Sequence, residues 1–195
     1  IAADGALALA PALVDLADLD AERVWSIAVN PRGGLYVGTG ESGRLFSIDA
    51  QGQAQLLFDS PELVLHALAV GPDGALYAGS APDGLIYKIA KDGRAETLSQ
   101  TGSHYVWDLT FANGQLYAAT GQPGQVLKIA NDGSHEVLFD PQDRHVMTLL
   151  AHGDYLYAGT SGKGRIYEID SAGTGRLLFE AAQEEIHDLV ADARG

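Results

Sequence analysis

The stretch that decides the fold is LYVGTGESGRLFSIDAQG, residues 35–52, because it returns three more times along the chain. The copies are LYAGSAPDGLIYKIAKDG at 76–93, LYAATGQPGQVLKIANDG at 116–133 and LYAGTSGKGRIYEIDSAG at 156–173. Their tyrosines, Tyr36, Tyr77, Tyr117 and Tyr157, are 41, 40 and 40 residues apart. A fixed period of this length is the sequence signature of a repeat architecture.

Each repeat predicts four short β-strands, here called a, b, c and d in chain order. The quoted copies supply b and c, and two apolar stretches flank each copy. Strand a is VWSIAV, VLHALAV, VWDLTF or VMTLLA, and strand d is AQLLFD, AETLSQ, HEVLFD or GRLLFE. The turns between strands are rich in Gly, Pro, Asp and Asn, and no segment has a helical period. The sequence therefore predicts an all-β protein.

A four-stranded unit that repeats about every 40 residues is typical of a β-propeller blade. We therefore predict a propeller with four complete four-stranded blades and a partial one. The blades are expected at about 22–61, 62–103, 104–143 and 144–183, with strand d of a preceding blade at 1–21 and strand a of a following blade at 184–195. A longer d-to-a loop is expected around residues 11–20.

By this alignment, the chain begins at the close of a strand c and ends after a strand a. Residues 1–195 are thus expected to be a single propeller domain or an excerpt of a larger propeller. The alternative is a closed ring assembled from several copies. If the chain is an isolated excerpt, it is expected either to self-associate through its open blade edges or to fray at its terminal segments.

The run IAVNPRGGLYVGTGESGRLFSID, residues 27–49, resembles the repeats of NHL-type and related bacterial propellers. It departs from the NHL pattern after strand b, where Thr-Gly replaces the usual Asp-x-x-Asn-Arg stretch. The Gly-His and strand-c Trp-Asp marks of WD40 repeats are also missing, since Trp107-Asp108 lies in strand a. The resemblance implies a WD40-like propeller fold and carries little functional specificity.

Composition excludes several classes of partner and chemistry. With 26 acidic and 12 basic residues, the formal net charge is -14, which repels nucleic acid and anionic membrane surfaces. The chain has no cysteine, so disulfides, Cys-ligated zinc and thiol catalysis are excluded. Absence of cysteine does not decide the compartment, although a periplasmic or secreted location is slightly favoured over the cytoplasm.

Candidate binding residues come from strand a, whose beginning lies at the mouth of the central channel in a propeller. One register along this strand is expected to face the channel, where carboxylates, an imidazole and hydroxyls suit a hard cation or a polar substrate. Asp108, Asp188 and His66 are its candidate metal ligands, with Ca²⁺ as the expected ion if any is bound and no other cofactor expected. This register consists of Ser26, His66, Asp108, Thr148 and Asp188.

The adjacent register contains large side chains that either pack between blades or form an exposed recognition platform. It consists of Trp25, Leu65, Trp107, Met147 and His187. His104 and His145 precede successive a strands and are within reach of the mouth. The segments DSPE, DPQDRH and AAQEE make the same rim acidic, which favours a cationic or sugar-like ligand over a phosphate.

Two functional hypotheses remain open at this stage. Enzyme signatures such as a nucleophile elbow, His-Glu-x-x-His or a phosphate-binding loop are missing from the sequence. A non-catalytic recognition or scaffold propeller, part of a larger bacterial protein and binding a protein or a small polar ligand, is therefore favoured. The alternative is a metal-dependent propeller hydrolase or lactonase with a channel cation.

Overall fold

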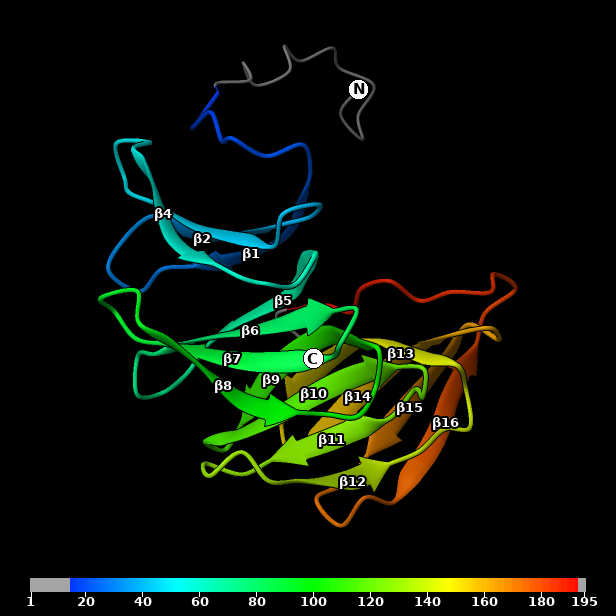
Figure 1. Ribbon diagram of the computed structural model, residues 1–195. Coiled ribbons are helices and arrows are strands. Elements are labelled where there is room, and N and C mark those ends of the chain that lie inside the picture. Colours follow the sequence, from blue (N-terminus) through cyan, green and yellow to red (C-terminus); the bar gives the residue numbers. More distant parts are fainter. Residues whose placement is uncertain (1–14, 193–195) are drawn as a thin grey trace, which may run out of the picture.

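The computed structural model describes residues 15–192, which fold into sixteen β-strands and no helix (Figure 1). Each run of four consecutive strands forms one antiparallel blade. Blade 1 contains β1 (Val24–Val29), β2 (Leu35–Thr39), β3 (Arg44–Ile48) and β4 (Ala54–Asp59). Blade 2 contains β5 (Val64–Val70), β6 (Leu76–Ala81), β7 (Leu85–Ile89) and β8 (Ala95–Gln100). Blade 3 contains β9 (Tyr105–Ala112), β10 (Gln115–Gly121), β11 (Val126–Ile129) and β12 (His135–Phe139). Blade 4 contains β13 (His145–His152), β14 (Tyr155–Ser161), β15 (Arg165–Ile169) and β16 (Gly175–Glu180).

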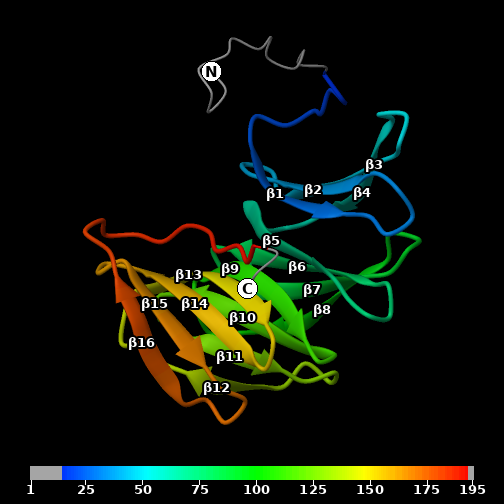
Figure 2. The ribbon, with the colours of Figure 1, turned by 180° about the vertical axis from the view of Figure 1, so that it is seen from behind.

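The blades follow one another around an arc, with the first strand of each on the inner side (Figures 1 and 2). β1 contacts β5, β5 contacts β9, and β9 contacts β13. A single backbone pairing between Gly121 and His145 joins blades 3 and 4 into one continuous sheet. This arrangement confirms the prediction of an all-β propeller. Among residues 15–192, no helix is long and apolar enough to cross a membrane.

The repeated tyrosines occupy equivalent positions in the four blades. Tyr36 pairs with Ala28 and Ser47, while Tyr77 pairs with Ala69 and Lys88. Tyr117 and Tyr157 have the corresponding neighbours on the first and third strands of blades 3 and 4. The forty-residue period is therefore a structural period as well.

The core lies between blades. One buried cluster joins blades 1 and 2 around Leu45, Leu65 and Tyr87, and corresponding clusters lie between blades 2 and 3 and between blades 3 and 4. Because both faces of an inner blade are covered, its strands read as almost continuous apolar runs. Burial of these faces is the main stabilising contribution.

Glycines of the c-to-d turns set the contact between neighbouring blades at their outer edge. Each turns its backbone, at positive φ, against the carbonyl of a leucine that precedes it by about one repeat. The pairs are Gly52 with Leu16, Gly93 with Leu57, Gly133 with Leu98 and Gly173 with Leu138. A Cβ at these positions would overlap the carbonyl. The last three leucines lie on strand d of the preceding blade.

Leu16 therefore lies where strand d of a blade preceding blade 1 would lie, although residues 15–23 form no strand. It precedes Val24 by about the same distance as Leu57 precedes Val64. The described part of the chain thus gives no support to a longer loop around residues 11–20. Most of the strand expected within residues 1–21 lies outside the described residues.

After β16, the chain returns toward the inner strands (Figures 1 and 2). Glu185 pairs with Ser161, and the Ile186 amide donates to the carbonyl of Thr160. Ile186 fits against Gly159 as Val106 fits against Gly79. Residues 184–188 therefore occupy the place of the first strand of a following blade, although no strand beyond the Ser161–Glu185 bridge is formed among the described residues.

Candidate functional site

The first strand of every blade carries a β-bulge near its beginning. In each case one residue is skipped in the pairing with the second strand, which re-aims that side chain. The skipped residues are Trp25, His66, Trp107 and Met147. The bulges lie at the same place in all four blades, and they divide the strand into two registers with different surroundings.

The bulges correct the sequence alignment of blade 2. His66 was expected in the polar register with Ser26 and Asp108, but the structure places it with Trp25 and Trp107. Leu65, expected beside the tryptophans, pairs with Ser80 as Val106 pairs with Thr120. The cause is that β5 begins one residue earlier than β1, so the two initial valines are not equivalent. Ala67 takes the place of Ser26 in blade 2.

The polar register bonds across blade boundaries. The hydroxyl of Ser26 donates to the carbonyl of Leu65, 3.0 Å away in blade 2. The Asp108 carboxylate accepts the amides of Leu109, at 2.8 Å, and of Leu149 in blade 4, at 2.7 Å. It also accepts the hydroxyl of Thr148, which is 4% exposed, at 3.2 Å. These three residues therefore form contacts between blades, and the expectation that their register lines the channel stays a prediction.

Burial raises the pKa of Asp108 to about 6, against the opposing effect of its hydrogen bonds. The charge of Asp188 raises the pKa of Asp108 further, as the smallest of the contributions. Asp188 itself is exposed, and it accepts the amide of Leu189 at 2.8 Å as Asp108 accepts that of Leu109. The two aspartates are therefore equivalent in the repeat but differ in burial.

The bulged register leads into a continuous series of ring contacts, here called the aromatic row. Its members are Trp25, His66, Tyr105, Trp107 and His145. The ring of His66 is 5.0 Å from Trp25 at 76° and 4.4 Å from Trp107 at 45°. Tyr105 stacks on Trp107 at 4.8 Å and 9°. The row therefore spans all four blades along the inner strands.

The blade 3 to blade 4 end of the row is held rigidly. The indole N–H of Trp107 donates to Nδ1 of His145 at 2.9 Å, and the two rings meet at 72°. Gly121 lies directly beneath both rings, where a Cβ would overlap each of them. Since Nδ1 of His145 accepts this bond, the neutral ring carries its proton on Nε2. Burial, followed by the charge of Arg144, lowers the pKa of His145.

His66, in the middle of the row, is neutral at physiological pH. Its burial between two indoles lowers its pKa to about 4. Burial is the whole cause of that shift, and no hydrogen bond joins the imidazole to another described residue. The ring thus offers one N–H donor and one nitrogen acceptor. At the blade 1 end, Trp25 is 49% exposed.

The composition of the row was only partly predictable. Trp25 and Trp107 were expected in one register of the first strands, and His145 within reach of the mouth. Tyr105 was missed, although residues two apart on a strand share a face and Tyr105 precedes Trp107 by two. His104 is exposed, with its ring 6.4 Å from Tyr105, and it lies beside the row. Met147 is half-buried and His187 is exposed.

The rim is less acidic than its sequence suggested. Glu62 is buried, and its carboxylate accepts the hydroxyl of Ser80 at 3.0 Å and the amide of Asp83 at 2.9 Å. Asp143 accepts the hydroxyl of Thr160 at 2.9 Å. These carboxylates fix the d-to-a loops onto the following blade. Glu184 and Glu185 remain exposed, the latter 2.9 Å from Nε2 of His187.

The three candidate metal ligands do not converge. His66 belongs to the aromatic row, whereas Asp108 is committed to two amides and a hydroxyl. Within residues 15–192, no group of three or more His, Cys, Asp or Glu side chains is arranged to hold a metal ion.

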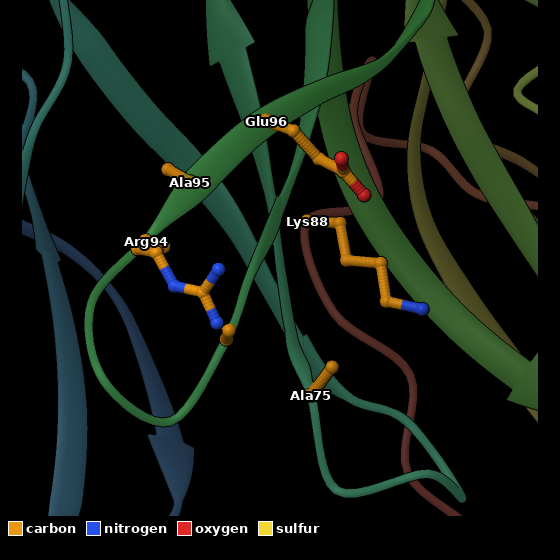
Figure 3. Close-up of a pocket in the computed structure, with 6 residues that line it drawn as sticks. Ala75, Lys88, Arg94, Ala95 and Glu96 are labelled. Atoms are coloured by element: carbon orange, nitrogen blue, oxygen red, sulfur yellow. The ribbon is translucent and has the colours of Figure 1, made fainter.

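Shallow grooves lie elsewhere on the blades. A groove of about 520 Å³ in blade 2 is lined by Ala75, Lys88, Ala90, Arg94, Ala95 and Glu96 (Figure 3). Its cations are already paired, Lys88 with Asp73 at 2.8 Å and Arg94 with Asp92 at 2.7 Å. A groove of about 420 Å³ repeats the position in blade 3, around Lys128 and Glu136. Because the same groove recurs in blades 2 and 3, it is a feature of blade geometry and not a dedicated binding site.

Comparison with solved structures shows that the chain has the propeller fold. It is similar to a selenomethionine-substituted virginiamycin B lyase from Staphylococcus aureus, with a TM-score of 0.71 and 16% identity over 80% of this chain and 55% of that one. It is also similar to a chain of a nidogen/laminin complex, with a TM-score of 0.71 and 19% identity over 80% of this chain and 63% of that one. A luciferin-regenerating enzyme gives a TM-score of 0.57 and 19% identity over 72% of this chain and 54% of that one.

The chain thus spans little more than half the length of these neighbours. No protein-family model matches it, and no curated protein matches it. The resemblance of its repeats to the NHL type therefore stays a prediction. The neighbours include lyases and a partner of a protein complex, so at these identities they establish the architecture alone.

Proposed function

We propose that this chain is a non-catalytic recognition module whose contact surface for a ligand or partner protein is the aromatic row. The observation that supports the proposal is the continuity of ring contacts from Trp25 to His145 across four blades. Large aromatic side chains with one exposed end are the residues that most often dominate binding energy.

The surroundings of the row favour binding over chemistry. Its histidines have lowered pKa values and lie among rings, and for His145 the lowering by burial and by the charge of Arg144 exceeds the raising effect of the Glu185 carboxylate. The nearby carboxylates of Asp108 and Asp143 are engaged in bonds between blades and loops. What remains available to a ligand is apolar ring surface with a few neutral polar atoms.

The experiment that tests the proposal is a binding panel of immobilised peptides and oligosaccharides. It compares the unmodified chain with Trp25→Ala and with Tyr155→Ala, a matched control because Tyr155 is 44% exposed at a site away from the row. We expect some members to be retained by the unmodified chain and the control and lost by Trp25→Ala. Equal retention by all three proteins, or retention of none, would contradict the proposal.

The alternative, a metal-dependent hydrolase or lactonase, predicts a different result. A channel cation would raise the melting temperature by mass action. A calcium-dependent rise in melting temperature that disappears in Asp188→Ala would support that alternative. Asp188 is the exposed residue that occupies the position of Asp108 in the repeat.

A further inference from the structure

The turn between β9 and β10 contains the one Asn-Gly pair of the chain, Asn113-Gly114. Ala112 pairs with Gln115 across it, so the loop has two residues, and φ is positive at both, 51° at Asn113 and 79° at Gly114. These are the features of a type I′ turn, for which asparagine followed by glycine is a preferred pair. The hairpin therefore explains the pair, but the pair also brings together two groups that can react with each other.

The reacting groups are the side-chain amide carbon of Asn113 and the backbone nitrogen of Gly114. Both residues are exposed, and a Cβ at Gly114 would meet no atom within 4 Å beyond its chain neighbours, so nothing there blocks movement of the turn. The Gly114 amide donates no hydrogen bond to another described residue. In the turn after β11, by contrast, the Gly133 amide donates to the carbonyl of Ala130 at 3.0 Å. The Gly114 nitrogen is thus the less restrained nucleophile.

We propose that Asn113 is a site of covalent modification, at which the chain converts its own asparagine to aspartate and isoaspartate. Hydroxide removes the Gly114 amide proton, and the nitrogen attacks Cγ of Asn113. The bond from Cγ to the side-chain nitrogen breaks, ammonia leaves with a proton taken from water, and a five-membered succinimide remains. Water then opens the ring: attack at Cγ gives aspartate, and attack at the backbone carbonyl carbon gives isoaspartate. Water is consumed and ammonia released, without oxidation or reduction.

The other two asparagines provide comparisons within the same chain. Asn30 is followed by Pro31, whose nitrogen carries no proton and cannot attack in this way. Asn131 is exposed like Asn113, but it is followed by Asp132, whose side chain hinders the approach that glycine permits. Exposure therefore does not distinguish Asn113 from Asn131, whereas the following residue does.

The products change both the charge and the backbone of the turn. Asn113 lines a small cavity of about 30 Å³ together with Asp154 and Asp170, and either product adds a further carboxylate there, which these charges oppose. Isoaspartate also adds one backbone carbon between Ala112 and Gln115, so the two-residue turn no longer fits their pairing. We therefore expect β9 and β10 to separate at the end of the hairpin that lies away from the aromatic row.

Peptide mapping by mass spectrometry tests the proposal on the unmodified chain, incubated folded in mildly alkaline buffer and, in parallel, in urea. Deamidation raises the mass of a peptide by ~1 Da, and an isoaspartyl-specific carboxyl methyltransferase with a labelled methyl donor identifies isoaspartate. In the folded chain we expect at least ~10-fold more product at Asn113 than at Asn131, none at Asn30, and methyl labelling of the Asn113 peptide. Gly114→Ala, whose Cβ meets no neighbour, should slow the reaction at Asn113 and leave that at Asn131 unchanged.

Four results would overturn the proposal. Reaction of Asn113 in urea alone would show that the folded turn prevents the attack. Equal product at Asn113 and Asn131, or an unchanged rate at Asn113 in Gly114→Ala, would show that the glycine does not promote it. Aspartate without isoaspartate would indicate direct hydrolysis of the side chain. None of these results depends on the binding panel, so the proposed function is tested separately.

Discussion

Two neighbouring registers of the same inner strands differ in what surrounds them. Asp108 and Thr148 are bonded to each other across the boundary between blades 3 and 4, whereas Trp107 and His66, in the bulged register, lie against other rings and are partly exposed. The chemistry of the side chains does not explain the difference, since both registers were plausible ligand-binding sets. The bulge decides it, because it turns one side chain out of the space between blades. The bonds between blades therefore belong to the unbulged register, and the binding that we propose is assigned to the bulged one.

The largest expected effect comes from breaking the bonded register. Asp108→Ala leaves the Leu149 amide and the Thr148 hydroxyl without their acceptor, so the free energy of unfolding should fall by about 2–4 kcal/mol. Asp188→Ala, the equivalent exposed residue, should change it by less than about 0.5 kcal/mol. Urea denaturation of both variants measures this. Similar losses would mean that burial does not distinguish the two aspartates.

The second effect separates the two ends of the aromatic row. Gly121→Ala forces a Cβ into His145 and Trp107, which are bonded to each other, and we expect a loss of about 1–3 kcal/mol. In Gly40→Ala, the three atoms nearest to the new Cβ all belong to Trp25, a flexible side chain that is 49% exposed, and we expect a cost of less than about 1 kcal/mol. Thermal melting compares the two. A greater cost at Gly40 would place the rigid end of the row in blade 1.

The third effect concerns pH, where the two registers act in opposite directions. The folded pKa of Asp108 is raised from 3.8 to about 6, so acidification through this window stabilises the fold. That of His66 is lowered from 6.5 to about 4, so acidification from pH 6.5 destabilises it. Each contribution is about 1–3 kcal/mol at full effect. Asp108→Asn should therefore lose stability more steeply between pH 6.5 and 4 than the unmodified chain, and His66→Phe less steeply. Parallel pH profiles of unfolding free energy would contradict both assignments.

The smallest effect on the free energy of unfolding is expected for Trp25→Ala, the substitution that we expect to abolish binding. Trp25→Ala removes a ring that is 49% exposed and lies at the end of the row, so unfolding should change by no more than about 1 kcal/mol. Differential scanning calorimetry of this variant beside Tyr155→Ala provides the measurement. A cooperative loss several times larger would identify Trp25 as part of the core.

The sequence was sufficient for the strands, the blades and the equivalence of the tyrosines, because periodic apolar runs and turn residues depend on local chemistry. It was insufficient for the register of His66. A bulge adds a residue without leaving a local signal, and the earlier start of β5 at Val64 hides the shift. Burial of Asp108 and Glu62 could not be predicted either, since the amides and hydroxyls that bind them come from a neighbouring blade or loop.

The turn glycines at the outer edge have a consequence for how such a chain can change over evolutionary time. Gly93 and Gly133 each meet a leucine carbonyl contributed one repeat earlier, and each blade also supplies such a leucine to its successor. A duplicated unit inserted between two blades would bring both halves of this contact with it. Gene duplication can therefore lengthen the array without compensating substitutions at this edge, whereas replacing a single glycine blocks the seating of one unit on its neighbour.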